Sequence, residues 1–225
     1  WMTPSDQALL ERVRSAAAEI APLAGRIEAE RRLPEEALAP LRRAGAFKLA
    51  VPRVLGGAEA SPRTMLRAIE EVARADGSAG WCVMIGSTSG MMSGFLPEAV
   101  ARAIFAPDDV ITCGVFAPLG RATREGDGLR VSGRWPFASG CQHASFRMGG
   151  VLVAGDPPDL LPSGAPHVRS VLFDAADTRI IDTWNTSGLR GTGSHDFEVK
   201  DVLVPASRTF SLFTGTPWPE SALYR

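Results

Sequence analysis

The sequence is poor in the residues that usually build metal centres and disulfide frameworks, with only three cysteines and three histidines among 225 residues. Cys82, Cys113 and Cys141 have no zinc-type spacing, and an odd, sparse count favours free thiols in a reducing compartment. The histidines are scattered, so no metal ligand set and no catalytic triad is apparent. We therefore predict a metal-free, cytoplasmic protein.

The sequence also lacks an excess of charge of either sign. Its 24 basic and 25 acidic residues are interspersed and leave a formal net charge of −1. Without a basic patch there is no electrostatic footprint for nucleic acid or for an anionic membrane surface, so neither is expected as a partner. A composition of 45% hydrophobic and 22% charged residues excludes disordered, collagen-like and coiled-coil chains.

One segment, residues 77–97, has no charged residue at all over 21 positions. Five glycines and four serines dilute its apolar character too far for a membrane span. A helix enclosed by protein is the better interpretation. Gly86, Gly90 and Gly94 recur every four residues and would give this helix a smooth face, which predicts close approach by another helix or by a flat ligand.

Two kinds of periodicity divide the chain. Up to Pro107 apolar residues recur at helical spacing, as in the stripe from Leu9 to Ile27 and behind the capping pair Ser61-Pro62. Beyond Pro107, short β-type segments alternate with glycine, proline and aspartate turns. These segments are 110–116, 129–132, 148–154, 168–174, 179–183 and 197–204.

Regular short strands without intervening helices favour an antiparallel barrel or sandwich over a Rossmann unit. We therefore predict an α+β multidomain chain. An all-α N-terminal domain at 1–107 precedes an antiparallel β-barrel or sandwich domain at 108–210, and residues 211–225 begin a linker.

Three motifs in these regions belong together. One is Gly133-Arg-Trp-Pro-Phe-Ala-Ser-Gly-Cys-Gln-His-Ala144, which follows the turn Phe116-Ala-Pro-Leu-Gly-Arg-Ala122. The others are Gly188-Leu-Arg-Gly-Thr-Gly-Ser194, which leads into Asp201-Val-Leu-Val-Pro205, and Val51-Pro-x-x-x-Gly-Gly57. In this order they resemble the acyl-CoA dehydrogenase superfamily, and in particular its branch of flavin-dependent monooxygenases, the oxygenase components of two-component aromatic hydroxylases.

The resemblance implies a cofactor site at the first motif. Phe137 matches the position that covers the isoalloxazine ring, where offset stacking is the plausible geometry. Ser139 would lie on the same side of an extended strand and bond flavin N5 or O4. Trp135, Phe116 and Gly120 complete the set expected at the cofactor.

For substrate and proton transfer the candidates are fewer. Trp81 and Met84 match a helix beside the family's substrate cavity, although they could equally be ordinary core residues. His143 titrates in the right range for proton transfer, with a purely structural hydrogen bond as the alternative. Arg190 could bind a phosphate or anchor its glycine-rich turn, and the turn is favoured.

The function implied is that of an oxygenase. It would take reduced FMN or FAD from a separate reductase and use O2 to hydroxylate a small apolar, often aromatic, substrate. The alternatives are an acyl-CoA dehydrogenase, which the departures at Phe116-Ala-Pro and Phe137-Ala-Ser disfavour, and a non-catalytic flavin-binding or assembly module. Because the family continues into a C-terminal helical bundle that carries catalytic groups and tetramer contacts, we expect this chain to be a fragment of a homotetrameric protein.

Overall fold

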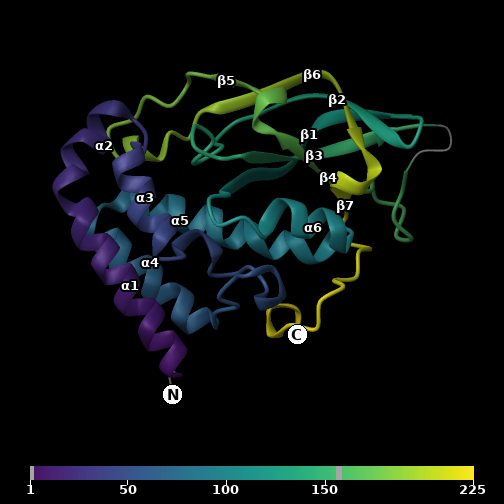
Figure 1. Ribbon diagram of the computed structural model, residues 1–225. Coiled ribbons are helices and arrows are strands. Elements are labelled where there is room, and N and C mark those ends of the chain that lie inside the picture. Colours follow the sequence, from purple (N-terminus) through teal and green to yellow (C-terminus); the bar gives the residue numbers. More distant parts are fainter. Residues whose placement is uncertain (1–2, 156–158) are drawn as a thin grey trace.

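The structure, a computed structural model, describes residues 3–155 and 159–225. A layer of helices lies against a single β-sheet (Figure 1). The change from helix to strand falls between Phe105 and Thr112. The predicted order of a helical region and a β region is therefore confirmed, whereas independent domains at 1–107 and 108–210, with a linker after them, stay a prediction.

Six α-helices form the first layer within the described residues. Ser61 accepts a backbone hydrogen bond at the start of its helix, as predicted. Two further caps were not predicted: Thr3 and Asp6 form a capping box, and Asp76 accepts a backbone hydrogen bond. No helix of the described residues has the length and apolar character needed to cross a membrane. The helices are α1 (Pro4–Ile20), α2 (Ala24–Glu30), α3 (Glu35–Arg43), α4 (Pro62–Ala75), α5 (Gly77–Ser89) and α6 (Glu98–Phe105).

Seven strands form one sheet in the order β5-β6-β2-β1-β3-β4-β7. All neighbours pair antiparallel except β1 and β3, which run parallel. The sheet is thus mixed rather than wholly antiparallel as expected, because segment 136–145 crosses the N-terminal end of β1 before β3 begins. The strands are β1 (Thr112–Glu125), β2 (Gly128–Trp135), β3 (Phe146–Ala154), β4 (Val168–Asp174), β5 (Arg179–Ile181), β6 (Asp196–Pro205) and β7 (Thr209–Phe210).

The turn expected at residues 116–122 is instead a bulge inside the long strand β1. The β1–β3 register shifts between Val115 and Gly120, so residues 116–119 lie opposite the single residue Gly150 of β3. A Cβ atom at Gly150 would lie 2.2 Å from the carbonyl oxygen of Phe116, so only glycine lets the bulge fold over β3.

The smooth face predicted for segment 77–97 is approached closely along its length. This segment forms α5 and the short 3-10 helix η4 (Gly90–Phe95). A Cβ atom at Gly86 would lie 2.7 Å from Phe47, one at Gly90 2.5 Å from Val51, and one at Gly94 2.4 Å from Tyr224. The prediction of close approach is confirmed, and the neighbours are other parts of this chain.

Three apolar clusters fill the interior. One lies among the helices and includes the predicted stripe from Leu9 to Ile27. Another lies on the sheet, where Trp135 stacks on Phe197 with ring centroids 4.9 Å apart. The third brings α6 together with Leu172 of β4 and Phe210 of β7, so it joins the helical layer to the sheet.

Candidate functional site

The candidate site begins at the tight turn that follows β2. The strand ends at Trp135, and Phe137 has a left-handed backbone with φ +60°. The prediction that Ser139 and Phe137 share one face of an extended strand is therefore wrong, because the chain turns at Phe137. The Phe137 side chain is 71% exposed and points outward, whereas Ser139 is only 6% exposed. A strained non-glycine residue of this kind is a feature that functional sites often contain.

The turn is held against the glycine-rich loop that surrounds the short 3-10 helix η6 (Arg190–Thr192). The backbone N–H of Ala138 donates to the His195 carbonyl, and that of Gly140 donates to the Thr192 carbonyl. The glycines allow this close packing, since a Cβ atom at Gly191 would lie 2.1 Å from Ile27 of α2. Thus the helical layer fixes the loop, and the loop fixes the turn.

Four hydrogen bonds run from α5 through this junction. Trp81 Nε1 donates to Ser139 Oγ at 2.9 Å, and Ser139 Oγ lies 2.7 Å from Ser194 Oγ. Ser194 Oγ lies 2.6 Å from Thr192 Oγ1, which donates to the Leu189 carbonyl at 2.9 Å. We call Ser139, Ser194 and Thr192 the hydroxyl relay; all three side chains are buried.

Three aromatic side chains lie beside the relay: Trp81 and Phe137 are exposed, and Trp184 is half-buried. Trp81 is 44% exposed, although its N–H reaches Ser139. Phe137 meets the ring of Trp184 edge-on, with centroids 6.3 Å apart, and Trp184 Nε1 donates to the Leu189 carbonyl at 3.0 Å. A buried hydroxyl beneath exposed apolar rings suits a flat ligand with apolar faces and a polar edge.

The sequence named Trp81 and Ser139, and the structure brings these two together. It missed Ser194, Thr192 and Trp184. The signal that could have found the first two is the alternation Gly191-Thr-Gly-Ser194, in which small residues bring hydroxyl side chains close to a neighbouring backbone.

Trp135 is a correction to the expected cofactor set. Its side chain is fully buried in the sheet core, its Nε1 donates to the Gly150 carbonyl at 2.9 Å, and no surface remains to meet a ligand. Gly120 makes room for this indole, because a Cβ atom there would lie 2.4 Å from the Trp135 ring. Gly120 is thus buried, whereas Phe116 on the bulge is 45% exposed.

Met84 lies one helical turn beyond Trp81 on α5 and is half-buried. Ile85 and Thr88 are half-buried as well, so this side of α5 is partly open rather than enclosed in the core. Arg190 lies away from this side; it reaches the Glu28 and Thr186 carbonyl oxygens at 3.4 Å, which fits the favoured interpretation of a turn anchor.

His143 is not brought to the hydroxyl relay. It lines a cavity of about 400 Å³ beside α3, together with Arg42 and Gln142. Its Nε2 is buried and has no hydrogen-bond partner among the described residues. Burial and the positive charges of Arg42 and Arg147 lower the pKa of His143 to about 4, so the imidazole is neutral at pH 7. A proton-transfer role at the relay therefore finds no support in this position.

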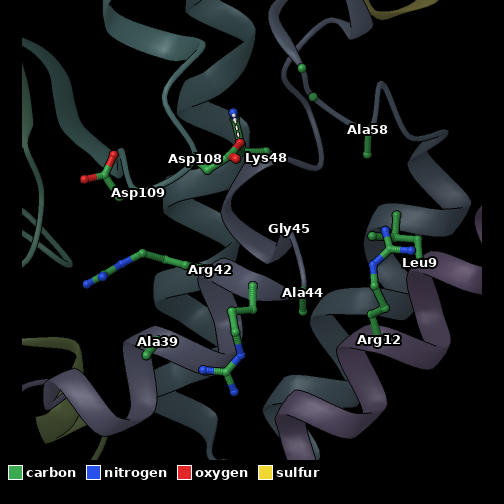
Figure 2. A pocket seen from close by; sticks show the side chains of 13 residues that line it. Leu9, Arg12, Ala39, Arg42, Ala44, Gly45, Lys48, Ala58, Asp108 and Asp109 are labelled. Carbon is green, nitrogen blue, oxygen red and sulfur yellow. Dashed lines mark hydrogen bonds and ion pairs between the residues drawn. The ribbon is translucent and has the colours of Figure 1, made fainter.

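A larger cavity, about 590 Å³, lies in the helical layer between α1, α3 and the loop at 56–58 (Figure 2). Lys48 lines it and pairs with Asp108 at 3.3 Å. None of the residues predicted for the cofactor or the substrate lines this cavity, so it is separate from the candidate site.

Comparisons with known proteins agree with the resemblance noted in the sequence. Residues 3–99 match the family described as acyl-CoA dehydrogenase, N-terminal domain. The chain is 34% identical over 189 residues to indole-3-acetate monooxygenase of Acinetobacter baumannii, covering 83% of this chain and 47% of that protein. It is 31% identical over 204 residues to the FADH2-dependent resorcinol hydroxylase, oxygenase component, of a Rhizobium species, covering 90% and 49%.

Among solved structures, the 3-HSA hydroxylase from Rhodococcus sp. RHA1 matches with a TM-score of 0.81 and 32% identity, over 90% of this chain and 51% of that one. This chain spans about half the length of the curated relatives it matches. Through residues 3–99 the chain belongs to the acyl-CoA dehydrogenase family, and over most of its length it is similar to the oxygenase components of flavin-dependent monooxygenases.

Proposed function

We propose that the protein containing this chain is the oxygenase component of a two-component flavin monooxygenase. It takes reduced FMN or FAD from a separate reductase and hydroxylates a small apolar, aromatic substrate with O2. The observation that carries the proposal is the buried Ser139 hydroxyl beneath the exposed rings of Trp81 and Phe137, in a chain whose matched relatives include a protein named as the oxygenase component of an FADH2-dependent hydroxylase.

The residues present fit a flavin. An isoalloxazine ring has two apolar faces and a polar edge, and the site offers exposed aromatic surface next to a hydroxyl with a fixed position. Phe137 and Trp184 would pack against the ring, and Ser139 would bond its polar edge. When bound, the reduced flavin supplies the electrons that activate O2.

The chain's own groups position the ring and keep water out. The hydroxyl relay is buried, and its members bond to one another. These hydroxyls therefore do not need water as a hydrogen-bond partner. Trp81 covers Ser139 from α5 and, with Met84, offers apolar surface to a substrate. Exclusion of water matters because it limits loss of the activated oxygen as hydrogen peroxide.

The same proposal covers the protein's setting. The thiols of Cys82, Cys113 and Cys141 are free and buried, and burial raises the pKa of each, so they suit a reducing cytoplasm that also supplies reduced flavin. The expected partners are the reductase, a small-molecule substrate and further copies of the protein, in a tetramer.

The test uses the complete protein with reduced FMN or FAD, O2 and a panel of phenols and indoles. We expect O2-dependent hydroxylated product that contains one atom of labelled oxygen from O2. Bleaching of bound FAD by an acyl-CoA, without any hydroxylated product, would instead establish the dehydrogenase alternative.

A further inference from the structure

The two ends of the hydroxyl relay fix the direction of every hydrogen bond in it. Trp81 Nε1 can only donate, and the Leu189 carbonyl can only accept. Each hydroxyl between them has one proton. The four bonds are therefore all satisfied in one arrangement only: Trp81 to Ser139, Ser139 to Ser194, Ser194 to Thr192, and Thr192 to Leu189.

The accepting end is itself held in place. Leu189 has a left-handed backbone with φ +51°, which the loop around η6 imposes. Its carbonyl also accepts from Trp184 Nε1 at 3.0 Å and from the Thr192 N–H at 3.2 Å. Three donors thus converge on one oxygen, and none of them can reverse its role without leaving that oxygen.

Ser139 emerges from this arrangement as an acceptor. It gives its proton to Ser194 and receives one from Trp81, which leaves one lone pair for a ligand. An acceptor at this place suits reduced flavin, which carries a proton on N5 and can donate it. Oxidised flavin has a lone pair on N5 instead and would need a donor.

We infer that Ser194 and Thr192 are positioning residues that orient the Ser139 hydroxyl and so make the site selective for reduced over oxidised flavin. This inference rests on the proposed function. To bond oxidised N5, Ser139 would have to turn its proton away from Ser194, and the relay would have to reverse. The Leu189 carbonyl would then lose the Thr192 proton, so one hydrogen bond is lost for each one gained.

The expected size of the effect is that of one hydrogen bond. We expect the relay to account for about a fivefold ratio between the Kd values of oxidised and reduced flavin. This ratio corresponds to a difference in binding free energy of about 1 kcal/mol. Ser194→Ala removes the acceptor of the Ser139 proton and frees that proton for oxidised N5. Thr192→Val removes the acceptor of the Ser194 proton. Ser194 can then donate to Ser139, which frees the Ser139 proton for oxidised N5.

The experiment measures the Kd of oxidised and of anaerobically reduced FMN and FAD for the complete protein and its variants. In Ser194→Ala and Thr192→Val, oxidised flavin should bind about fivefold more tightly and reduced flavin about as before. Thr192→Ser keeps the hydroxyl and should behave as wild type. Thr186→Val is the matched control in the same loop, since the Thr186 hydroxyl donates to the Gly188 carbonyl and is no part of the relay.

A second readout needs no flavin. The Trp81 indole N–H should exchange slowly in NMR spectra of wild type and of both relay variants, and fast in Ser139→Ala. An equal loss of affinity for both redox states in the relay variants would show a merely structural role and overturn the inference. Equal binding of both redox states by wild type would overturn it while leaving the proposed function intact, whereas binding of neither would reject the proposed function itself.

Discussion

Ser139 and His143 lie four residues apart in the segment after β2, and their surroundings differ in every respect. Ser139 is bonded to Trp81 and Ser194, and the bonds continue to a backbone carbonyl. His143 lines the cavity beside α3, its Nε2 has no partner among the described residues, and the positive charges of Arg42 and Arg147 lower its pKa.

The difference shows what the surroundings of Ser139 and those of His143 can each do. A fully satisfied network holds its groups in one geometry, which is what recognition of a rigid ring requires. An imidazole whose Nε2 is buried without a partner, and whose pKa two arginines lower, is held neutral and makes the fold sensitive to acid. The chemically familiar histidine is therefore the weaker candidate, and the serine is the stronger one.

The largest effect is expected at His143, as a dependence of stability on pH. Its pKa of about 4 in the folded state lies below the ordinary value of 6.5, so the unfolded chain binds the proton more readily. The contribution of His143 to the free energy of unfolding is therefore highest above pH 6.5. It falls by at most about 3 kcal/mol as the pH drops to about 4, because the unfolded chain takes up this proton first. Urea unfolding of wild type and of His143→Gln across this range measures it.

The His143→Gln curve should be flatter between pH 6.5 and pH 4, since the paired carboxylates lose their contributions in both proteins alike. An NMR titration of His143 provides the direct check. A titration midpoint near 6.5 in the folded protein would show that His143 is not held neutral by its surroundings, and would remove the contrast with Ser139.

Gly191→Ala should disturb the Ser139 side alone. The new Cβ atom would lie 2.1 Å from Ile27 and 3.0 Å from Ser78, and Ile27 is fully buried in the helical core. We expect a loss of about 2 kcal/mol in the free energy of unfolding, as for an overpacked core.

Gly188→Ala in the same loop is the matched control, because a Cβ atom there meets nothing within 4 Å. Thermal unfolding of both variants gives the comparison, and the His143 resonance should stay where it is in wild type. Equal melting temperatures for the two variants would refute close packing of the loop against α2.

Ser139→Ala should have the smallest effect on stability, about 1 kcal/mol, because it removes a partner from Trp81 and from Ser194. In the complete protein with reduced flavin, the same change should raise the share of O2 released as hydrogen peroxide at the expense of hydroxylated product. Ser89→Ala on α5 serves as the control, since the Ser89 hydroxyl donates to the Ile85 carbonyl within the helix and is no part of the relay. An unchanged peroxide share would remove Ser139 from the site.

Much of the architecture could be predicted because it depends on local patterns. The stripe from Leu9 to Ile27, the cap at Ser61 and the short β segments each follow from spacing along the chain. The approach to Gly86, Gly90 and Gly94 was predictable for the same reason, although not the neighbours themselves. Trp81 and Ser139 were found by motif rather than by geometry.

What the sequence determined by itself is therefore the order of the elements, the smooth face of segment 77–97 and the family to which the motifs belong. The tertiary structure alone decided the parallel pairing of β1 with β3, the outward turn at Phe137 and the burial of Trp135 in the sheet core. It also decided that Ser194 and Thr192 complete the relay. The physical reason is that a left-handed backbone, a crossover and a hydroxyl contact across 55 residues depend on partners distant in the chain, which no local periodicity encodes.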